Sequence, residues 1–240
     1  MRIAIVSDIH GNLTAFEAVL ADLRQTSPDL ILHGGDLAAG GARPAEVVDR
    51  MRELGWPGVV GNTDEMLFRP ESLDEFASQS SETLQPLFTA IEKMAAATRE
   101  TLGMDRINWL HGLPRTQIHD FLALVHASPE SLWRAPGADA SDDELQSTYA
   151  ELGQPLAVYA HIHRSFIRSV GGLIVANSGC VSLSYDGDFR AAYLLVEESK
   201  PTIRRVAYDM EKEVKELFGC GLPHADWVAR TMRSGSFLMP

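Results

Sequence analysis

Five short apolar segments of this 240-residue chain share one feature: each ends at a residue that can bind a metal ion. Each segment has the length and the aliphatic content of a buried strand. The residues that follow the five segments are Asp8 and His10, Asp36, Asn62, His126, and His161 with His163. Ligands of open α/β sheets bind at the carboxyl ends of the strands, so these five loops can bring seven oxygen and nitrogen donors together.

The first sixty residues alternate between strand and helix patterns. We expect strands at 2–6, 30–32 and 58–60, a helix with an apolar stripe over 13–23, and a second helix between Pro44 and Gly55. Proline favours the first turn of a helix and glycine its end. This βαβαβ order predicts a largely parallel sheet with right-handed crossovers.

The middle of the chain mixes helices and strands, and the last third favours hairpins. Residues 71–102 predict mostly helix, interrupted near Pro86, because their apolar positions have helical spacing. Ser141 begins a capping box, which marks another helix start. The remaining expectations are strands at 121–125, 156–159, 165–170, 173–176, 181–185, 190–196 and 202–208, a helix at 211–218 and an irregular tail.

Length and charge limit the class of protein. The chain suits one hydrophobic core and shows no repeat or linker, so we expect a single domain over 1–240 with a helical insertion around 71–102. The formal net charge of -12 argues against nucleic acid as a partner. Two cysteines without a pairing motif and no segment of membrane length predict a soluble, cytoplasmic protein with no membrane partner. The oligomeric state stays open.

The seven donors favour particular metals. Each motif alone has an ordinary explanation, since Asp36 or Asn62 could be a turn residue and His126 a buried core histidine. Five such residues at successive strand ends argue for a common site. Imidazole with carboxylate suits manganese, iron or zinc, and also nickel or cobalt. Seven donors exceed what one catalytic ion needs, and they match two ions that share one carboxylate.

Several of these motifs resemble those of a known family. The segments Asp8-Ile9-His10-Gly11-Asn12, Gly35-Asp36, Gly61-Asn62-Thr63-Asp64, His126 and His161-Ile162-His163 are similar, in order, to the five signature motifs of the calcineurin-like metallophosphoesterases. The short chain and the loop at 177–181 resemble the small bacterial and archaeal phosphodiesterase branch of that family.

The resemblance implies both a fold and a mechanism. The fold is a four-layer αββα sandwich, with two mixed β-sheets flanked by helices. Asp36, Asn62 and His126 would act at the catalytic centre, where a water or hydroxide between two divalent or trivalent ions attacks phosphorus. The implied ligands are Asp8, His10 and His163 for the first ion, Asn62, His126 and His161 for the second, and Asp36 for both.

Three departures from the family pattern bear on the substrate. Many relatives have a histidine in the third motif that helps the leaving group depart, and here the residue is Thr63. The proton donor could instead be Asp64 or His111, although catalytic geometry decides such roles. Val125 and Ala160 replace glycines before their histidines, and Ile162 replaces a threonine, without loss of a ligand.

Substrate contacts are expected from Thr63, His111 and Arg164. An arginine suits the geometry of a phosphate, although an exposed one mostly pairs with a carboxylate. Specificity is expected to lie in the insertion at 71–102 and the loops at 111–120. His33, His119 and His224 lie outside the strand-end pattern and are interpreted as structural.

Four functions compete. The sequence favours a phosphodiesterase that acts on a small phosphoester, because Thr63 removes the usual proton donor. A phosphomonoesterase acting on nucleotides or proteins is the alternative within the same chemistry. A protein-binding scaffold of the same fold would be expected to lack several ligands, whereas this chain keeps all seven. A nuclease fits poorly, because the chain has no basic stripe.

Overall fold

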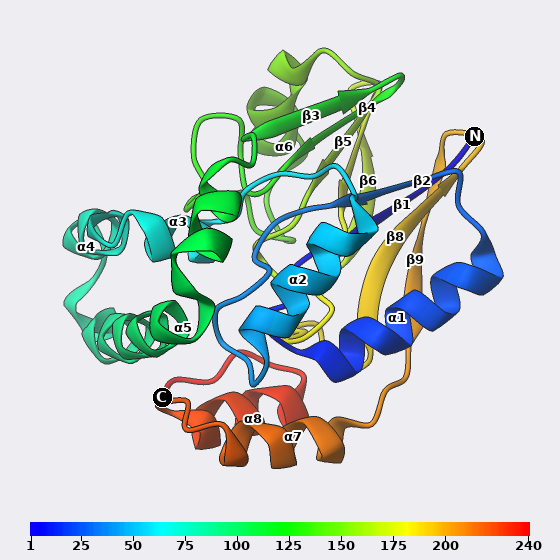
Figure 1. Ribbon diagram of the computed structural model, residues 1–240. Helices are drawn as coiled ribbons and strands as arrows, with labels where there is room; N and C mark the ends of the chain where they lie inside the picture. Colours follow the sequence, from blue (N-terminus) through cyan, green and yellow to red (C-terminus); the bar gives the residue numbers. More distant parts are fainter.

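Two β-sheets lie face to face in the computed structural model, which describes all 240 residues (Figure 1). The first sheet has the order β2-β1-β8-β9 and the second the order β3-β4-β5-β7-β6. The strands are β1 (Arg2–Val6), β2 (Leu30–His33), β3 (Thr116–His119), β4 (Leu122–Val125), β5 (Leu156–Tyr159), β6 (Phe166–Val170), β7 (Leu173–Asn177), β8 (Ala191–Glu197) and β9 (Lys200–Val206). Both sheets are mixed: β1 pairs in parallel with β2 and antiparallel with β8.

Helices cover the outer faces of both sheets. The long helices are α1 (Leu13–Thr26), α2 (Pro44–Leu54), α3 (Asn62–Phe68), α4 (Glu71–Ser78), α5 (Gln85–His111), α6 (Asp142–Tyr149), α7 (Met210–Gly219) and α8 (Ala225–Ser234), and two 3₁₀ turns lie at Glu82–Leu84 and Ala150–Leu152. None of these helices is long and apolar enough to cross a membrane.

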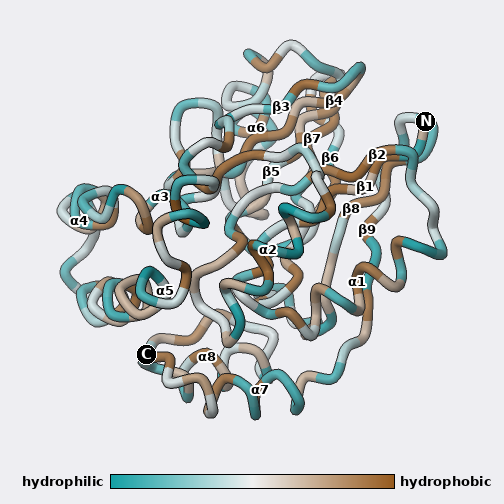
Figure 2. The backbone as a smooth tube through the Cα atoms, viewed as in Figure 1, coloured by the Kyte–Doolittle hydropathy of each residue, from teal (hydrophilic) through white to brown (hydrophobic).

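The alternation of side chains along β1 explains the layers. Ile3 and Ile5 pack between the two sheets, whereas Ala4 and Val6 pack toward Phe16 of α1. Successive side chains of a strand point to opposite faces, so one strand serves two cores. On the second sheet, α6 packs over a separate apolar cluster. The expected four-layer sandwich is therefore confirmed, and β1 and β2 form the hydrophobic centre seen in Figure 2.

Local signals placed the first two helices correctly. The Asn12 side chain accepts a hydrogen bond from the Ala15 N–H at the start of α1. Pro44 occupies the first turn of α2, and Gly55 ends that helix with a φ of 63°. A left-handed residue is a common helix end, and glycine adopts it without steric cost.

Several expected elements differ in the structure. Residues 58–60 form only one bridge, between His33 and Gly58. Residues 181–185 form a loop, because the Val181 N–H is bonded to the Ser7 carbonyl beneath the site. Pro86 lies in the first turn of α5 and does not interrupt it. Strand β3 and helices α3 and α8 were not expected, and α8 occupies part of the predicted irregular tail.

Candidate metal centre

The predicted donors lie in loops with an unusual backbone. Five of the seven have positive φ angles, namely 54° at Asp8, 47° at His10, 55° at Asp36, 65° at His161 and 56° at His163. Such angles are uncommon outside glycine and concentrate at functional sites. Hydrogen bonds fix the first two loops to each other, since the N–H groups of Asp8 and His10 donate to the carbonyls of Gly35 and Asp36, both at 3.0 Å.

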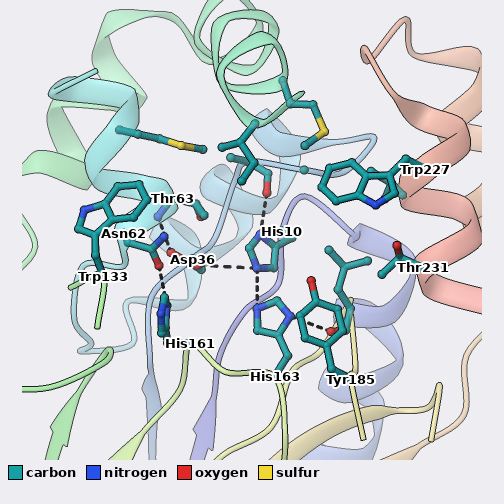
Figure 3. A pocket seen from close by; sticks show the side chains of 17 residues that line it. His10, Asp36, Asn62, Thr63, Trp133, His161, His163, Tyr185, Trp227 and Thr231 are labelled. Atoms are coloured by element: carbon teal, nitrogen blue, oxygen red, sulfur yellow. Dashed lines mark hydrogen bonds and ion pairs between the residues drawn. The ribbon is translucent and has the colours of Figure 1, made fainter. Parts of the chain in front are cut away.

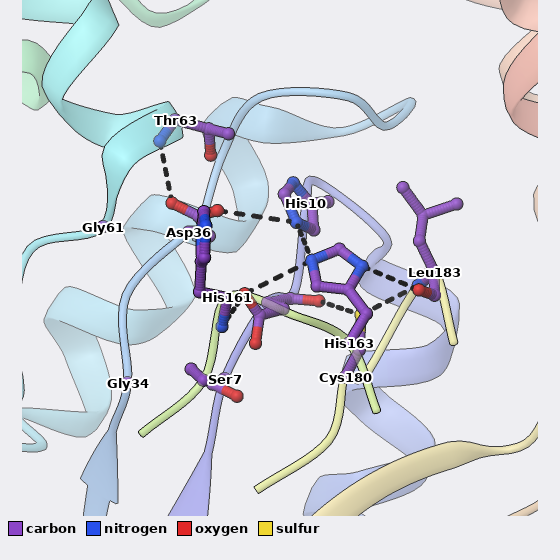
Figure 4. Close-up of polar contacts among 12 residues, drawn as sticks. Ser7, His10, Gly34, Asp36, Gly61, Thr63, His161, His163, Cys180 and Leu183 are labelled. Atoms are coloured by element: carbon purple, nitrogen blue, oxygen red, sulfur yellow. Dashed lines mark hydrogen bonds and ion pairs between the residues drawn. The ribbon is translucent and has the colours of Figure 1, made fainter. Parts of the chain in front are cut away.

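Four of the donors form a tight buried group. One ligand atom from each of Asp8, His10, Asp36 and His163 lies within 4.8 Å of the others. Figure 4 shows His10, Asp36 and His163 of this group. His163 Nε2 is 3.4 Å from Asp8 Oδ1 and 3.2 Å from His10 Nε2. The residues expected to hold the first ion and the shared carboxylate therefore meet in space.

The other three donors lie on the far side of Asp36. His126 Nε2 and His161 Nδ1 are each 2.9 Å from Asn62 Oδ1. Asp36 Oδ2 is 3.5 Å from His126 Nε2 and 3.7 Å from His10 Nε2. Asp36 thus faces both groups, and we refer to all seven residues as the donor cluster.

Backbone carbonyls orient three of the four imidazoles. Nδ1 of His10, His126 and His163 lies 2.7 Å from the carbonyl oxygens of Ala39, Gly34 and Leu183, respectively. A carbonyl only accepts, so each Nδ1–H donates and each Nε2 is directed into the cluster. This is the arrangement by which proteins fix histidines that bind metals.

Two further observations show that the cluster suits a cation. Asp8 Oδ2 is buried and has no hydrogen-bond partner. Nε2 of His10 and Nε2 of His163 face each other, so a proton or a cation must separate them. Unpaired acceptors are costly inside a protein. The residues therefore fit metal ions of the kind that bind imidazole and carboxylate.

Electrostatics inside the cluster favour the ligand forms of Asp8, His10 and His161. Burial alone would raise the pKa of Asp8, but His163, His126 and His10 lower it to about 2. Burial lowers the pKa of His161 to about 4 and also lowers the pKa of His10. Burial opposes protonation of His163 as well, but Cys180, Tyr185 and Asp8 raise its pKa well above the usual value. A metal ion must therefore displace a proton at this position.

Asp64 has a structural position. Its carboxylate accepts hydrogen bonds from the N–H groups of Asp36, Leu37 and Gly61, at 2.8, 3.0 and 3.2 Å. Burial and the charge of Asp36 raise its pKa to about 7, while the N–H groups of Leu37 and Gly61 oppose this rise. Both oxygens are thus committed to holding the Asp36 loop, and Asp64 does not line the pocket above the cluster.

Gly61 permits this close approach. A Cβ atom at Gly61 would lie 2.0 Å from Asp36 Oδ1 and 2.5 Å from the Asp36 nitrogen. The loop before α3 therefore has no room for a side chain. The glycine of the third motif is required by packing against the carboxylate that faces both halves of the cluster.

The three expected substrate contacts have different outcomes. Thr63 lines the pocket, and its N–H donates to Asp36 Oδ1 at 2.9 Å. His111 is exposed at the end of α5, with its ring centroid 4.6 Å from that of Phe68, and is not among the residues that line the pocket. Arg164 is exposed and also lies outside that set. His111 lies at the end of α5, outside the pocket. Substrate contact by Arg164 stays a prediction.

A pocket of about 160 Å³ opens above the donor cluster (Figure 3). Ala39, Gly40 and Thr63 line it next to the cluster. We call the rest of its lining the apolar wall: Met66, Ile91, Met94, Trp133, Leu183, Tyr185, Trp227, Val228 and Thr231. In Figure 3, Trp133 and Trp227 lie on opposite sides of the cluster. Sequence analysis missed most of this wall. The helical spacing of Trp227, Val228 and Thr231 could have indicated that α8 has a buried face.

Comparisons with known proteins agree with this geometry. The model of the calcineurin-like phosphoesterase superfamily domain matches residues 1–201. Uncharacterized protein MJ0912 of Methanocaldococcus jannaschii is 27% identical, with 97% of this chain and 98% of that protein covered. The crystal structure of a metallophosphoesterase from Sphaerobacter thermophilus is 27% identical, with a TM-score of 0.78 and coverage of 98% and 99%. Hypothetical protein PH1004 from Pyrococcus horikoshii OT3 shares the fold at 16% identity, with a TM-score of 0.84 and coverage of 99% of both chains.

Proposed function

The chain belongs to the calcineurin-like phosphoesterase superfamily, and on that premise we propose that it is a two-metal phosphoesterase that favours phosphodiesters. The observation that carries the proposal is the donor cluster, in which Asp36 faces a group of three donors on each side. Asp8, His10 and His163 would hold one ion, and Asn62, His126 and His161 the other. Manganese, iron and zinc fit this donor set best.

The chain's own residues position the reaction. When bound, the ions lower the pKa of a water molecule and neutralise charge on the phosphoryl oxygens. The carbonyls of Ala39, Gly34 and Leu183 keep three imidazoles in the ligand tautomer. Apolar side chains around the pocket reduce competing contact with water, which strengthens electrostatic interactions at the phosphate.

Charge in the pocket supports a diester as substrate. No lysine or arginine lines it, so a second phosphate group or the extra charge of a monoester has no cationic side chain to bind. Thr63 takes the place of the family's histidine, so substrates whose leaving groups need little protonation are favoured. Phosphodiesters carry one negative charge and place ester groups on both sides of phosphorus.

Turnover of two chromogenic esters tests the proposal. With manganese added, bis(p-nitrophenyl) phosphate should be hydrolysed with a kcat/KM at least about tenfold above that of p-nitrophenyl phosphate, and chelation should abolish both activities. A preference for the monoester would instead establish the phosphomonoesterase. A protein that binds no metal and turns over neither ester would support the scaffold.

A further inference from the structure

Helix α8 places side chains directly beside the donor cluster. Trp227, Val228 and Thr231 line the same pocket as His10, Asp36 and His163 (Figure 3). Helix α8 lies beyond residues 1–201, which match the family model. This side of the pocket is therefore built by a part of the chain outside the residues that the family model matches.

The hydroxyl of Thr231 points to a ligand. Thr231 is only 2% exposed, and its Oγ1 is buried without a hydrogen-bond partner. A helical threonine usually bonds to a carbonyl in the preceding turn. Thr98 on α5 does so, since its hydroxyl donates to the Met94 carbonyl at 2.8 Å. Thr231 lacks such a bond in a pocket next to the donor cluster, so a group that enters the pocket can supply the missing partner.

The two tryptophans present only their rings. The indole N–H of Trp227 donates to the Leu238 carbonyl, and that of Trp133 donates to Glu65 Oε2, both at 2.7 Å. Phe76 also stacks on the Trp133 ring, with the two ring centroids 5.2 Å apart. Both indoles are thus fixed by contacts outside the pocket. What they offer to a ligand is apolar and aromatic surface.

Size and charge narrow the ligand further. The pocket measures about 160 Å³, and an apolar cavity of about 150 Å³ is large enough for benzene. Its lining contains no lysine, arginine or glutamate. An uncharged group of about one ring fits this space, whereas a chain of phosphates would find no counter-charge.

We propose that α8 forms a specificity subsite for the ester group of the substrate that stays on phosphorus. The group is uncharged, has the size of one aromatic ring, and carries one polar atom that hydrogen-bonds to Thr231 Oγ1. Trp227 and Val228 provide the apolar contact. This inference rests on the proposed phosphodiesterase function and names the substrate class for it.

Three diesters with one leaving group test the subsite. All release p-nitrophenolate, and the group that stays on phosphorus is methyl, phenyl or 3-hydroxyphenyl. We expect kcat/KM to be at least about tenfold higher for phenyl than for methyl, and higher again for 3-hydroxyphenyl. Trp227→Leu should reduce the advantage of phenyl, whereas Met232→Leu, on the same helix but outside the pocket lining, should keep it.

A matched pair at Thr231 tests the hydrogen bond. Thr231→Val keeps the shape and removes the hydroxyl, so it should lower the ratio of kcat/KM for the 3-hydroxyphenyl ester to kcat/KM for the phenyl ester about tenfold, through KM. Thr231→Ser keeps the hydroxyl and should retain the preference. Equal losses on both esters in Thr231→Val would overturn the assignment.

Failure of the subsite and failure of the phosphodiesterase give different results. Equal kcat/KM for the methyl and phenyl esters would refute the subsite while the phosphodiesterase stands. If no diester is hydrolysed, calorimetry with phenylphosphonate and methylphosphonate on manganese-loaded protein replaces turnover. Tighter binding of phenylphosphonate that Trp227→Leu removes would support the subsite, and equal binding would overturn it.

Discussion

The donor cluster and the apolar wall form one pocket by different physical means. The donor cluster is set by directional contacts: three imidazoles are fixed by carbonyls at 2.7 Å, and five donors have left-handed backbone angles. Much of the apolar wall is set by packing of Met94, Leu183, Trp227 and Val228 in one apolar group. Directional contacts fix geometry to a fraction of an ångström, whereas apolar packing tolerates exchange of similar volumes. The chemistry is thus fixed in one region and selectivity is adjustable in the other.

The strongest test of this contrast removes the charge shared by both halves of the donor cluster. Asp36→Asn should lower kcat/KM by at least about 1,000-fold and reduce bound metal, because an amide neither neutralises nor bridges two cations. Elemental analysis and turnover of bis(p-nitrophenyl) phosphate check this. Asp74→Asn, an exposed change on α4, is the matched control. Full activity in Asp36→Asn would show that the cluster is not the catalytic centre.

An ion pair connects α7, which packs against α8 of the apolar wall, to the rest of the protein. Arg43 Nη2 lies 2.8 Å from Glu213 Oε2, and the Glu213 side chain is 1% exposed. Glu213→Gln should lower the free energy of unfolding by about 3 kcal/mol, because it leaves a partly buried guanidinium unpaired. Denaturant unfolding measures this change.

The double variant Arg43→Met with Glu213→Leu provides the control for that ion pair. It should recover much of the lost stability, because two apolar groups need no pairing. We expect metal content to stay unchanged in both proteins, since the donor cluster does not depend on the apolar wall. Loss of metal in Glu213→Gln would show that the donor cluster does depend on the packing of the apolar wall.

A buried histidine at the end of β2 should make stability depend on pH. His33 has neither ring nitrogen hydrogen-bonded, and burial lowers its pKa to about 4. Between pH 6.5 and 4 the unfolded chain binds a proton that the folded protein excludes, so stability falls as pH falls. His33→Leu should remove up to about 3 kcal/mol of this decrease.

The measurement is chemical unfolding of the wild-type protein and His33→Leu, in the presence of a chelator, at several pH values between 7 and 4. His111→Gln alters an exposed histidine and should keep the wild-type dependence. A stability difference between wild type and His33→Leu that stays constant with pH would contradict the expectation. The apolar wall contains no histidine. The effect of a substitution in the wall on the free energy of unfolding should therefore stay the same between pH 7 and pH 4.

The smallest expected effect lies where the donor cluster meets the apolar wall. Thr63→His restores the residue type that many relatives have in the third motif. It should raise kcat/KM about tenfold for an alkyl diester with a poor leaving group and leave p-nitrophenyl esters nearly unchanged, because only poor leaving groups need a proton. Thr63→Gln supplies a polar side chain without an acid and serves as the control. Equal effects on both esters would argue against a missing proton donor.

Much of the fold could be predicted because its signals are local. The apolar run at 2–6, the helical spacing over 13–23 and the pair Pro44 and Gly55 each act within a few residues, and the structure confirms the strand and both helices. The meeting of the seven donors has a related origin. Most of them follow apolar strands, and the carboxyl ends of strands in the sheets bring such residues together. Asn62 differs, because residues 58–60 form only one bridge.

Tertiary structure decided what depends on distant partners. Residues 181–185 have the composition of a strand but form a loop, since Val181 and Ser182 bond to the loop of Asp8 instead of a sheet edge. Helix α8 follows α7 in the chain, yet its residues line the same pocket as Asp36. The packing of Trp227 holds α8 there, and α7, which packs against α8, is tied to the rest of the protein by the ion pair between Glu213 and Arg43. Periodicity shows which face of a helix is apolar. Which distant surface that face covers is decided only when the whole chain packs, and here that surface borders the donor cluster.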